Sequence, residues 1–157
     1  MNSITLLQPQ KIVFGENSIE NLSKDALLET SNSILLLVAT PLLTAVKTTI
    51  QNLKSKNKEV SLVEYTFLGE PTFSQFNELL DANKNFNPDC VIGVGGGSVL
   101  DCAKLLAALI NNTQKLKDVV GIGFLNGRDI KLICIPTTSG TGSEVSPNAI
   151  LLNEDTQ

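Results

Sequence analysis

The residues of this chain best suited to chemistry lie in two clusters of glycines and hydroxyls, each placed directly after an apolar segment. The first cluster has three consecutive glycines and then a serine at the start of an expected helix. The first turn of a helix has unpaired N–H groups and a partial positive charge, so it attracts phosphate. Gly95, Gly96 and Gly97 would let a pyrophosphate approach the main chain. We expect Ser98 to cap the helix and donate its hydroxyl, and Asp101 to accept from N–H groups of the same turn.

The second cluster, PTTSGTGSEV over residues 136–145, has hydroxyl donors beside two further glycines. Thr137, Thr138 and Thr141 could serve the sugar and phosphates of a nucleotide. Each cluster alone could also be a tight turn whose polar groups bond their own backbone. Two such clusters at neighbouring strand ends favour a nucleotide-binding site over two unrelated turns.

The first cluster is not the usual dinucleotide fingerprint. A G-x-G-x-x-G pattern beginning at Gly93 would need glycine at position 98, where serine stands. The cluster also follows a late strand, and no acidic residue ends the next strand as a partner for a ribose. The ordinary Rossmann pattern therefore fails on both register and position.

The elements that must position these clusters alternate along the chain. Apolar runs predict strands at 11–14, 33–39, 59–67, 90–94, 131–135 and 148–152, and helical spacing predicts helices at 18–29, 42–56, 74–85 and 98–110. Alternation with short connections indicates an α/β fold, an open and mainly parallel sheet with helices on both faces. Ligands of such sheets bind at the carboxyl ends of the strands, where both clusters fall.

The composition excludes several classes of protein. Of 157 residues, 42% are hydrophobic and 18% charged, with a net charge of −4 and dispersed basic residues, which argues against a nucleic-acid partner. No apolar run has the length of a membrane span and the N-terminus is no signal peptide, so we expect a cytoplasmic protein without a membrane partner. The three cysteines form no C-x-x-C pair and are expected to be reduced thiols, not metal ligands.

Together the two clusters resemble the iron-containing (group III) alcohol dehydrogenase family. Its G-G-G-S-x-x-D-x-A-K pattern is matched by Gly95 to Lys104, and its P-T-T-x-G-T-G-S-E-V pattern by Pro136 to Val145. The K-I-V-F-G at 11–15 and the E-P-T at 70–72 are also similar. Dehydroquinate synthases share the fold but differ around the second pattern. The resemblance implies a Rossmann-like, dehydroquinate-synthase-like N-terminal domain over residues 1–157 that binds NAD or NADP.

The resemblance also assigns expected roles. It implies that Gly96, Gly97 and Ser98 hold the pyrophosphate, while Gly95 and Asp101 shape the loop. It also implies that Thr137, Thr138 and Thr141 line the nicotinamide side and that Glu70 approaches the adenosine. Lys104 and Glu144 would be a pair of structural loop anchors. The family often has an aspartate for the adenosine ribose after the first central strand, where this chain has Ala39-Thr40. A threonine does not repel a 2′-phosphate and can donate to it, so we predict that NADP(H) is tolerated or preferred.

The activity implied by the resemblance is hydride transfer between NAD(P) and a primary alcohol or aldehyde, assisted by iron. The family holds its metal with one aspartate and three histidines in a helical C-terminal domain, and this chain has no histidine. We therefore expect the nucleotide-binding domain alone, with no catalytic or metal-binding residue and no turnover. Two alternative functions stay open: a metal-independent reductase resembling maleylacetate reductases, and a stand-alone nucleotide-binding module. We also expect that the chain can self-associate into a homo-oligomer.

Overall fold

A four-stranded parallel sheet forms the centre of the computed structural model, which describes residues 9–156. Its strands are β1 (Ser33–Ala39), β2 (Glu59–Tyr65), β3 (Cys90–Gly95) and β4 (Lys131–Pro136), in the order β2-β1-β3-β4. Every neighbouring pair is parallel, so all carboxyl ends meet at one edge. The two central strands are almost continuously apolar and buried, as strands covered on both faces must be.

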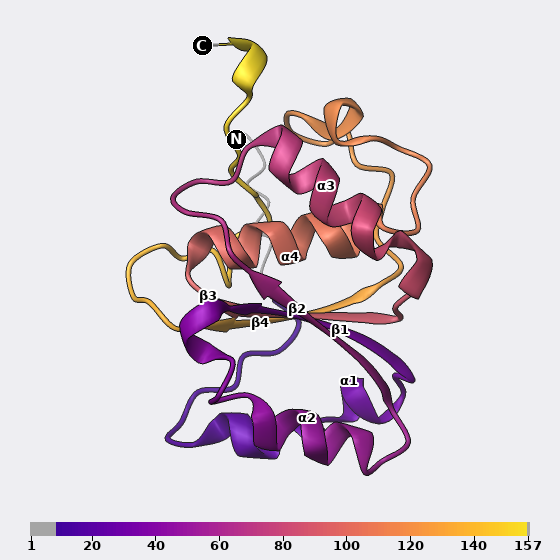
Figure 1. Cartoon of the computed structure of the whole chain (residues 1–157), viewed down its shortest axis with the longest axis vertical. Helices are drawn as coiled ribbons and strands as arrows, with labels where there is room; N and C mark the ends of the chain where they lie inside the picture. Colours follow the sequence, from indigo (N-terminus) through magenta and orange to yellow (C-terminus); the bar gives the residue numbers. More distant parts are fainter. Residues whose placement is uncertain (1–8, 157) are drawn as a thin grey trace, which may run out of the picture.

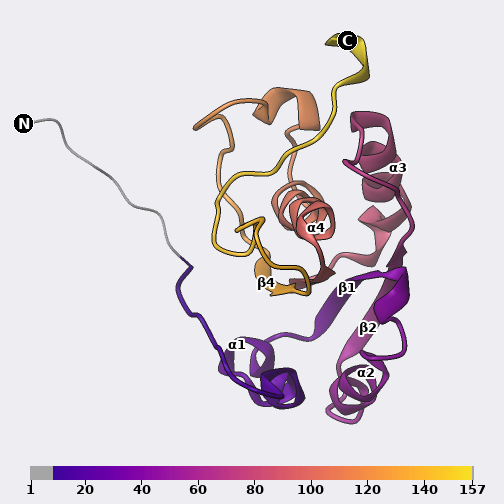
Figure 2. The same cartoon turned by 90° about the vertical axis from the view of Figure 1, so that its left-hand side faces the viewer.

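Helices cover both faces of the sheet. The 3-10 helix Ser18–Lys24, α1 (Ala26–Glu29) and α2 (Lys47–Lys54) lie on one face, and α3 (Phe73–Asn83) and α4 (Gly97–Leu109) on the other (Figure 1). The quarter turn in Figure 2 shows the sheet between these two layers. Short 3-10 helices also occur at Thr40–Leu42, Lys84–Phe86, Leu116–Val119 and Glu154–Thr156. The predicted open α/β sheet with helices on both faces is confirmed.

The hydrophobic core is divided by the sheet into two clusters. Successive side chains of a strand point to opposite faces. Leu35 and Leu37 of β1 accordingly belong to the cluster under α3 and α4, while Ile34 and Leu36 belong to the cluster over α1 and α2. This arrangement fixes α4 against β3, with its first turn at the carboxyl edge.

Two predicted strands differ in the structure. Residues 11–14 form no regular secondary structure and pair with no described strand, and Phe14 is fully exposed. The predicted strand at 148–152 is reduced to a single bridge between Thr72 and Leu152. A strand needs a neighbour for its backbone groups, and an apolar pattern alone does not supply one.

Two predicted helices are shorter than expected. The helix over 18–29 is interrupted at Asp25, whose carboxylate accepts from the N–H of Leu27 at 3.0 Å and caps α1. The helix over 42–56 begins only at Lys47, because the chain first makes a 3-10 turn that contains Pro41. Among residues 9–156, none of the helices combines the length and the apolarity that crossing a bilayer requires.

Candidate functional site

A pocket of about 200 Å³ opens at the carboxyl edge of the sheet, between the start of α4 and the segment that follows β4. It is lined by Glu70, Gly97, Ser98, Asp101, Thr141, Ser143, Ser146, Asn148 and Ile150. Five of these were predicted from the sequence as cofactor residues. A larger hollow of about 280 Å³ lies at the other end of α4 and contains none of the predicted residues, so the smaller pocket is the candidate site.

The start of α4 faces this pocket without a side-chain cap. Gly96 is the N-cap residue, has an extended backbone and makes no side-chain capping bond. The prediction that Ser98 caps the helix is therefore wrong: it stands in the first turn and lines the pocket. The first N–H groups of α4 consequently find no capping oxygen among the described side chains. With the partial positive charge of the helix end, they can hold an anion.

The three glycines are explained by close neighbours, since none has a positive φ. A Cβ on Gly95 would lie 2.6 Å from a methyl of Val99. A Cβ on Gly96 would lie 3.2 Å from the hydroxyl of Thr138, and one on Gly97 would lie 3.1 Å from the methyl of Thr141. The bare backbone therefore lets the second cluster pack directly on the first, as expected for neighbouring strand ends.

The second cluster gets its shape from two further glycines. Gly140 and Gly142 have φ of 104° and 64°, a left-handed backbone that other residues rarely adopt. Between them, Thr141 accepts a hydrogen bond from the N–H of Ser143 at 3.3 Å. At the base of the loop, the N–H of Thr137 donates to the carbonyl of Gly95 at 3.0 Å and continues the pairing of β4 with β3.

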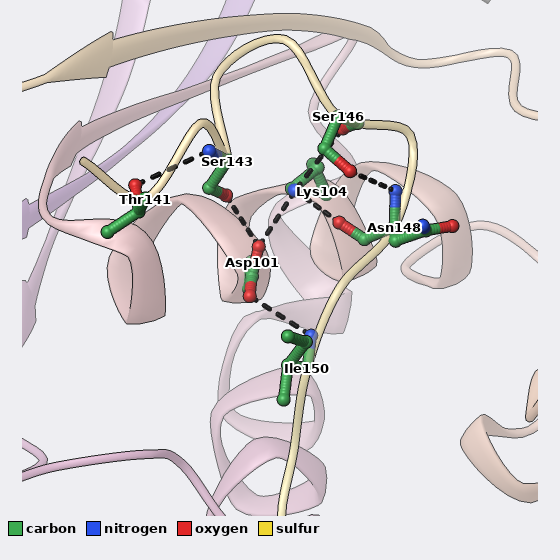
Figure 3. A network of polar contacts seen from close by, with 7 residues as sticks. All are labelled: Asp101, Lys104, Thr141, Ser143, Ser146, Asn148 and Ile150. Carbon is green, nitrogen blue, oxygen red and sulfur yellow. Dashed lines mark hydrogen bonds and ion pairs between the residues drawn. The ribbon is translucent and has the colours of Figure 1, made fainter.

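A buried ion pair ties the chain after the second cluster to α4 (Figure 3). Asp101 accepts from the hydroxyl of Ser143 at 2.6 Å and from the N–H of Ile150 at 3.0 Å. Its carboxylate also lies 2.7 Å from the ammonium of Lys104. The prediction that Asp101 accepts from N–H groups of its own helix start is wrong: the carboxylate instead binds residues that lie more than 40 positions further along the chain.

Lys104 is the second half of this anchor. It donates to the carbonyl of Ser146 at 3.3 Å and to that of Asn148. The expected pairing with Glu144 does not occur among residues 9–156, because the ammonium is already shared between Asp101 and these carbonyls. The pair therefore fixes Ser146 and Asn148, which line the pocket.

The remaining predicted residues lie around the pocket at different distances. Glu70 lines it from the loop after β2, and Thr138 reaches the edge of the glycine loop. Thr40 lies at the carboxyl end of β1 but does not line the pocket, and its hydroxyl donates to the carbonyl of Tyr65 at 3.2 Å. Sequence reasoning missed Ser146, Asn148 and Ile150, which also line the pocket, since they lie beyond the second cluster.

The three cysteines are free thiols, as predicted. Burial raises the pKa of Cys102 to about 12, and the nearby Asp101 and Glu70 add to this effect, so that thiol is protonated and inert at neutral pH. Within residues 9–156, no three His, Cys, Asp or Glu side chains are grouped so that they could hold a metal ion.

Comparison with known proteins places this geometry in a family. Residues 9–157 match the family model of the iron-containing alcohol dehydrogenases. The chain is 34% identical to aldehyde-alcohol dehydrogenase 2 of Entamoeba histolytica over 116 residues, which are 66% of this chain and 13% of that protein.

Solved structures agree with the match. An alcohol dehydrogenase from Oenococcus oeni superposes with a TM-score of 0.86 at 25% identity, covering 98% of this chain and 41% of that one. The NADH-dependent butanol dehydrogenase A of Thermotoga maritima gives a TM-score of 0.83 at 27% identity, covering 99% and 40%. The chain thus spans less than half the length of these relatives. It belongs to the iron-containing alcohol dehydrogenase family.

Proposed function

We propose that this chain is the nucleotide-binding domain of an alcohol or aldehyde oxidoreductase, and that it holds NAD or NADP with the pyrophosphate at the start of α4. One observation carries the proposal: the first turn of a 13-residue helix is left uncapped and opens into a pocket lined by hydroxyls. Such a turn binds phosphate through its N–H groups and its dipole. The similarity to an NADH-dependent butanol dehydrogenase supports the nature of the ligand.

The residues of the pocket fit the parts of a dinucleotide. The N–H groups of Gly97 and Ser98 and the serine hydroxyl would donate to phosphate oxygens. Thr137, Thr138 and Thr141 extend from this point along the second cluster toward the nicotinamide, and Gly95, Gly96 and Asp101 keep the two clusters together. Glu70 would accept from ribose hydroxyls, because a carboxylate has no hydrogen to donate to a phosphate.

The domain would contribute orientation to the reaction. The bound nicotinamide supplies or accepts the hydride that is exchanged with the carbon of a primary alcohol or aldehyde. By fixing the pyrophosphate, the start of α4 would decide which face of the nicotinamide points away from the sheet. The residues described do not fit iron, since they offer no cluster of metal ligands. Metal assistance would need ligands from elsewhere in the protein.

The choice between the two cofactors depends on the carboxyl end of β1. Thr40 stands there, where a carboxylate would repel a 2′-phosphate. The Thr40 hydroxyl already donates its hydrogen to the carbonyl of Tyr65, so this hydrogen is not available to a 2′-phosphate. We infer that NADP(H) is tolerated without a strong preference.

Fluorescence titration of this chain with NADH and NADPH tests the proposal. We expect both to bind, and Ser98→Ala to weaken binding by about tenfold, the effect of losing a hydrogen bond to a charged group. Ser55→Ala is the matched control, since Ser55 is an exposed serine after α2 that donates only to Asn52. Failure to bind either nucleotide, or equal losses in the two variants, would contradict the proposal.

A further inference from the structure

Glu70 lines the pocket from the loop between β2 and α3, and this loop has little structure of its own. Leu68 is 93% exposed, and Gly69 has a left-handed φ of 74°. Residues 68–70 make no backbone hydrogen bond to any other part of residues 9–156. The position of the Glu70 carboxylate therefore depends on where the chain is next held.

The chain is next held at Pro71, directly after Glu70. The carbonyl of the buried Pro71 accepts a hydrogen bond from the N–H of Leu152 at 2.9 Å. The N–H of Phe73 donates in turn to the carbonyl of Leu152 at 3.0 Å. These are the two bonds of the bridge between Leu152 and Thr72. Both join main chain to main chain, so they fix the backbone at the residue next to Glu70.

The segment that contains Leu152 is also fixed to α4, two residues earlier. The N–H of Ile150 donates to the carboxylate of Asp101 at 3.0 Å, and Ile150 itself lines the pocket (Figure 3). Two residues of extended chain span at most about 7 Å. One short segment therefore connects the loop of Glu70 to the helix whose first turn faces the pocket.

A side-chain bond continues this connection at the start of α3. The carboxylate of Glu154 accepts from the N–H of Ser74 at 3.4 Å, in the first turn of that helix. A negative charge is favourable near a helix N-terminus. The segment thus holds the loop on both sides of Thr72, by backbone bonds and by this carboxylate.

We propose that Leu152 is a positioning residue of the dinucleotide site, whose two backbone bonds hold the loop so that the Glu70 carboxylate stays at the pocket and accepts from a ribose hydroxyl. The inference rests on the proposed function above. A carboxylate on an unattached loop has to be ordered when the ligand binds, and a loop that is already held avoids part of this entropic cost. The chain that leaves the second cluster then orients the ribose end of the site as well as its phosphate end.

The test compares Leu152→Pro, which lacks the N–H that Pro71 accepts, with Leu152→Ala, which keeps it. NADH and inorganic pyrophosphate, which has no ribose, are titrated into each variant by calorimetry. We expect Leu152→Pro to bind NADH about five- to tenfold more weakly and pyrophosphate as the wild type does. Leu152→Ala should bind both as the wild type does. Adding Leu152→Pro to Glu70→Ala should weaken NADH binding no further, because Leu152 acts through Glu70.

A second set of variants decides the matter if Leu152→Pro fails to fold. Glu154→Ala removes only the bond to Ser74, and should weaken NADH binding by about two- to threefold. Glu154→Gln keeps an oxygen that can accept this bond, and should bind NADH as the wild type does. Asp155→Ala is the matched control, since Asp155 is equally charged and exposed and its N–H bond to Asn153 does not involve its side chain.

The results that would overturn the inference differ from those that would refute the proposed function. Wild-type affinity for NADH in Leu152→Pro, or in Glu154→Ala where the proline variant does not fold, overturns this inference alone. Equal losses of NADH and pyrophosphate, or a further loss when Leu152→Pro is added to Glu70→Ala, show that the segment supports the pocket without acting through Glu70. A wild type that binds neither NADH nor NADPH refutes the proposed function and this inference with it.

Discussion

Among residues 9–156, two ion pairs join an aspartate to the lysine three positions further along, and they provide a comparison of a buried and an exposed pair. Asp101–Lys104 and Asp81–Lys84 have nearly equal separations, 2.7 and 2.8 Å. Their side chains differ in burial: 9% and 10% exposed in the first pair, 70% and 56% in the second. The same substitution in each pair therefore compares a buried carboxylate that also accepts hydrogen bonds from Ser143 and Ile150 with an exposed one.

We expect Asp101→Asn to lower the free energy of unfolding by about 3–5 kcal/mol, because it leaves the buried Lys104 ammonium without a counter-charge. The amide also cannot accept through its nitrogen, so one of the bonds from Ser143 and Ile150 is lost. Asp81→Asn should cost less than about 1 kcal/mol, as exposed pairs do.

Urea unfolding followed by circular dichroism measures both free energies, and limited proteolysis reports on residues 143–150. In Asp101→Asn that segment should become a cleavage site, since Asp101 and Lys104 supply its bonds to α4. Lys104→Met combined with Asp101→Asn should cost less than the sum of the two single changes. The argument is refuted if Asp101→Asn costs no more than Asp81→Asn, or if residues 143–150 stay protected.

Three further predictions concern the glycine loop, the cofactor and alkaline pH. Gly97→Ala should weaken both stability and NADH binding. Adding Thr141→Ser, which removes the methyl 3.1 Å from the new Cβ but keeps the Thr141 Cβ at 3.2 Å, should restore part of the stability and none of the binding; recovery of both would mean that the glycine serves packing alone. Thr40→Asp should weaken NADPH by more than about tenfold and leave NADH nearly unchanged, and equal effects on the two would contradict the cofactor proposal. Burial raises the pKa of Cys90 and Cys102 from 9.0 to about 12, so unfolded thiols ionise first and stability should fall as the pH rises from 9.0 toward 12; urea titrations should show a smaller fall in Cys102→Ala, and an equal fall would exclude this thiol.

The sequence predicts well those elements whose own residue pattern shows that they are buried. The strand predicted at 33–39 is found at Ser33–Ala39, because a continuous apolar run admits little other than a covered parallel strand. The helix after the glycines begins within one residue of its predicted start. Failures occur where the outcome depends on a neighbour: residues 11–14 have a strand-like pattern but no partner in the described sheet.

The site shows the same division. Both clusters could be placed at the carboxyl edge, since alternation of strand and helix fixes that edge. The partners of Asp101 could not, because Ser143 and Ile150 lie 42 and 49 positions away and no periodicity links them.

The features of the candidate site differ in how strongly they support the nucleotide proposal. The glycine triplet alone carries little, because each glycine already has a packing reason in the protein itself. The uncapped first turn of α4 is different, since a serine is present there and a small change of the chain could have made it the N-cap. Instead, Ser98 lines the pocket, and the N–H groups of the helix end have no side-chain cap. The contrast between these unpaired donors and Asp101, which has three partners close by, supports the proposal of a ligand that accepts hydrogen bonds.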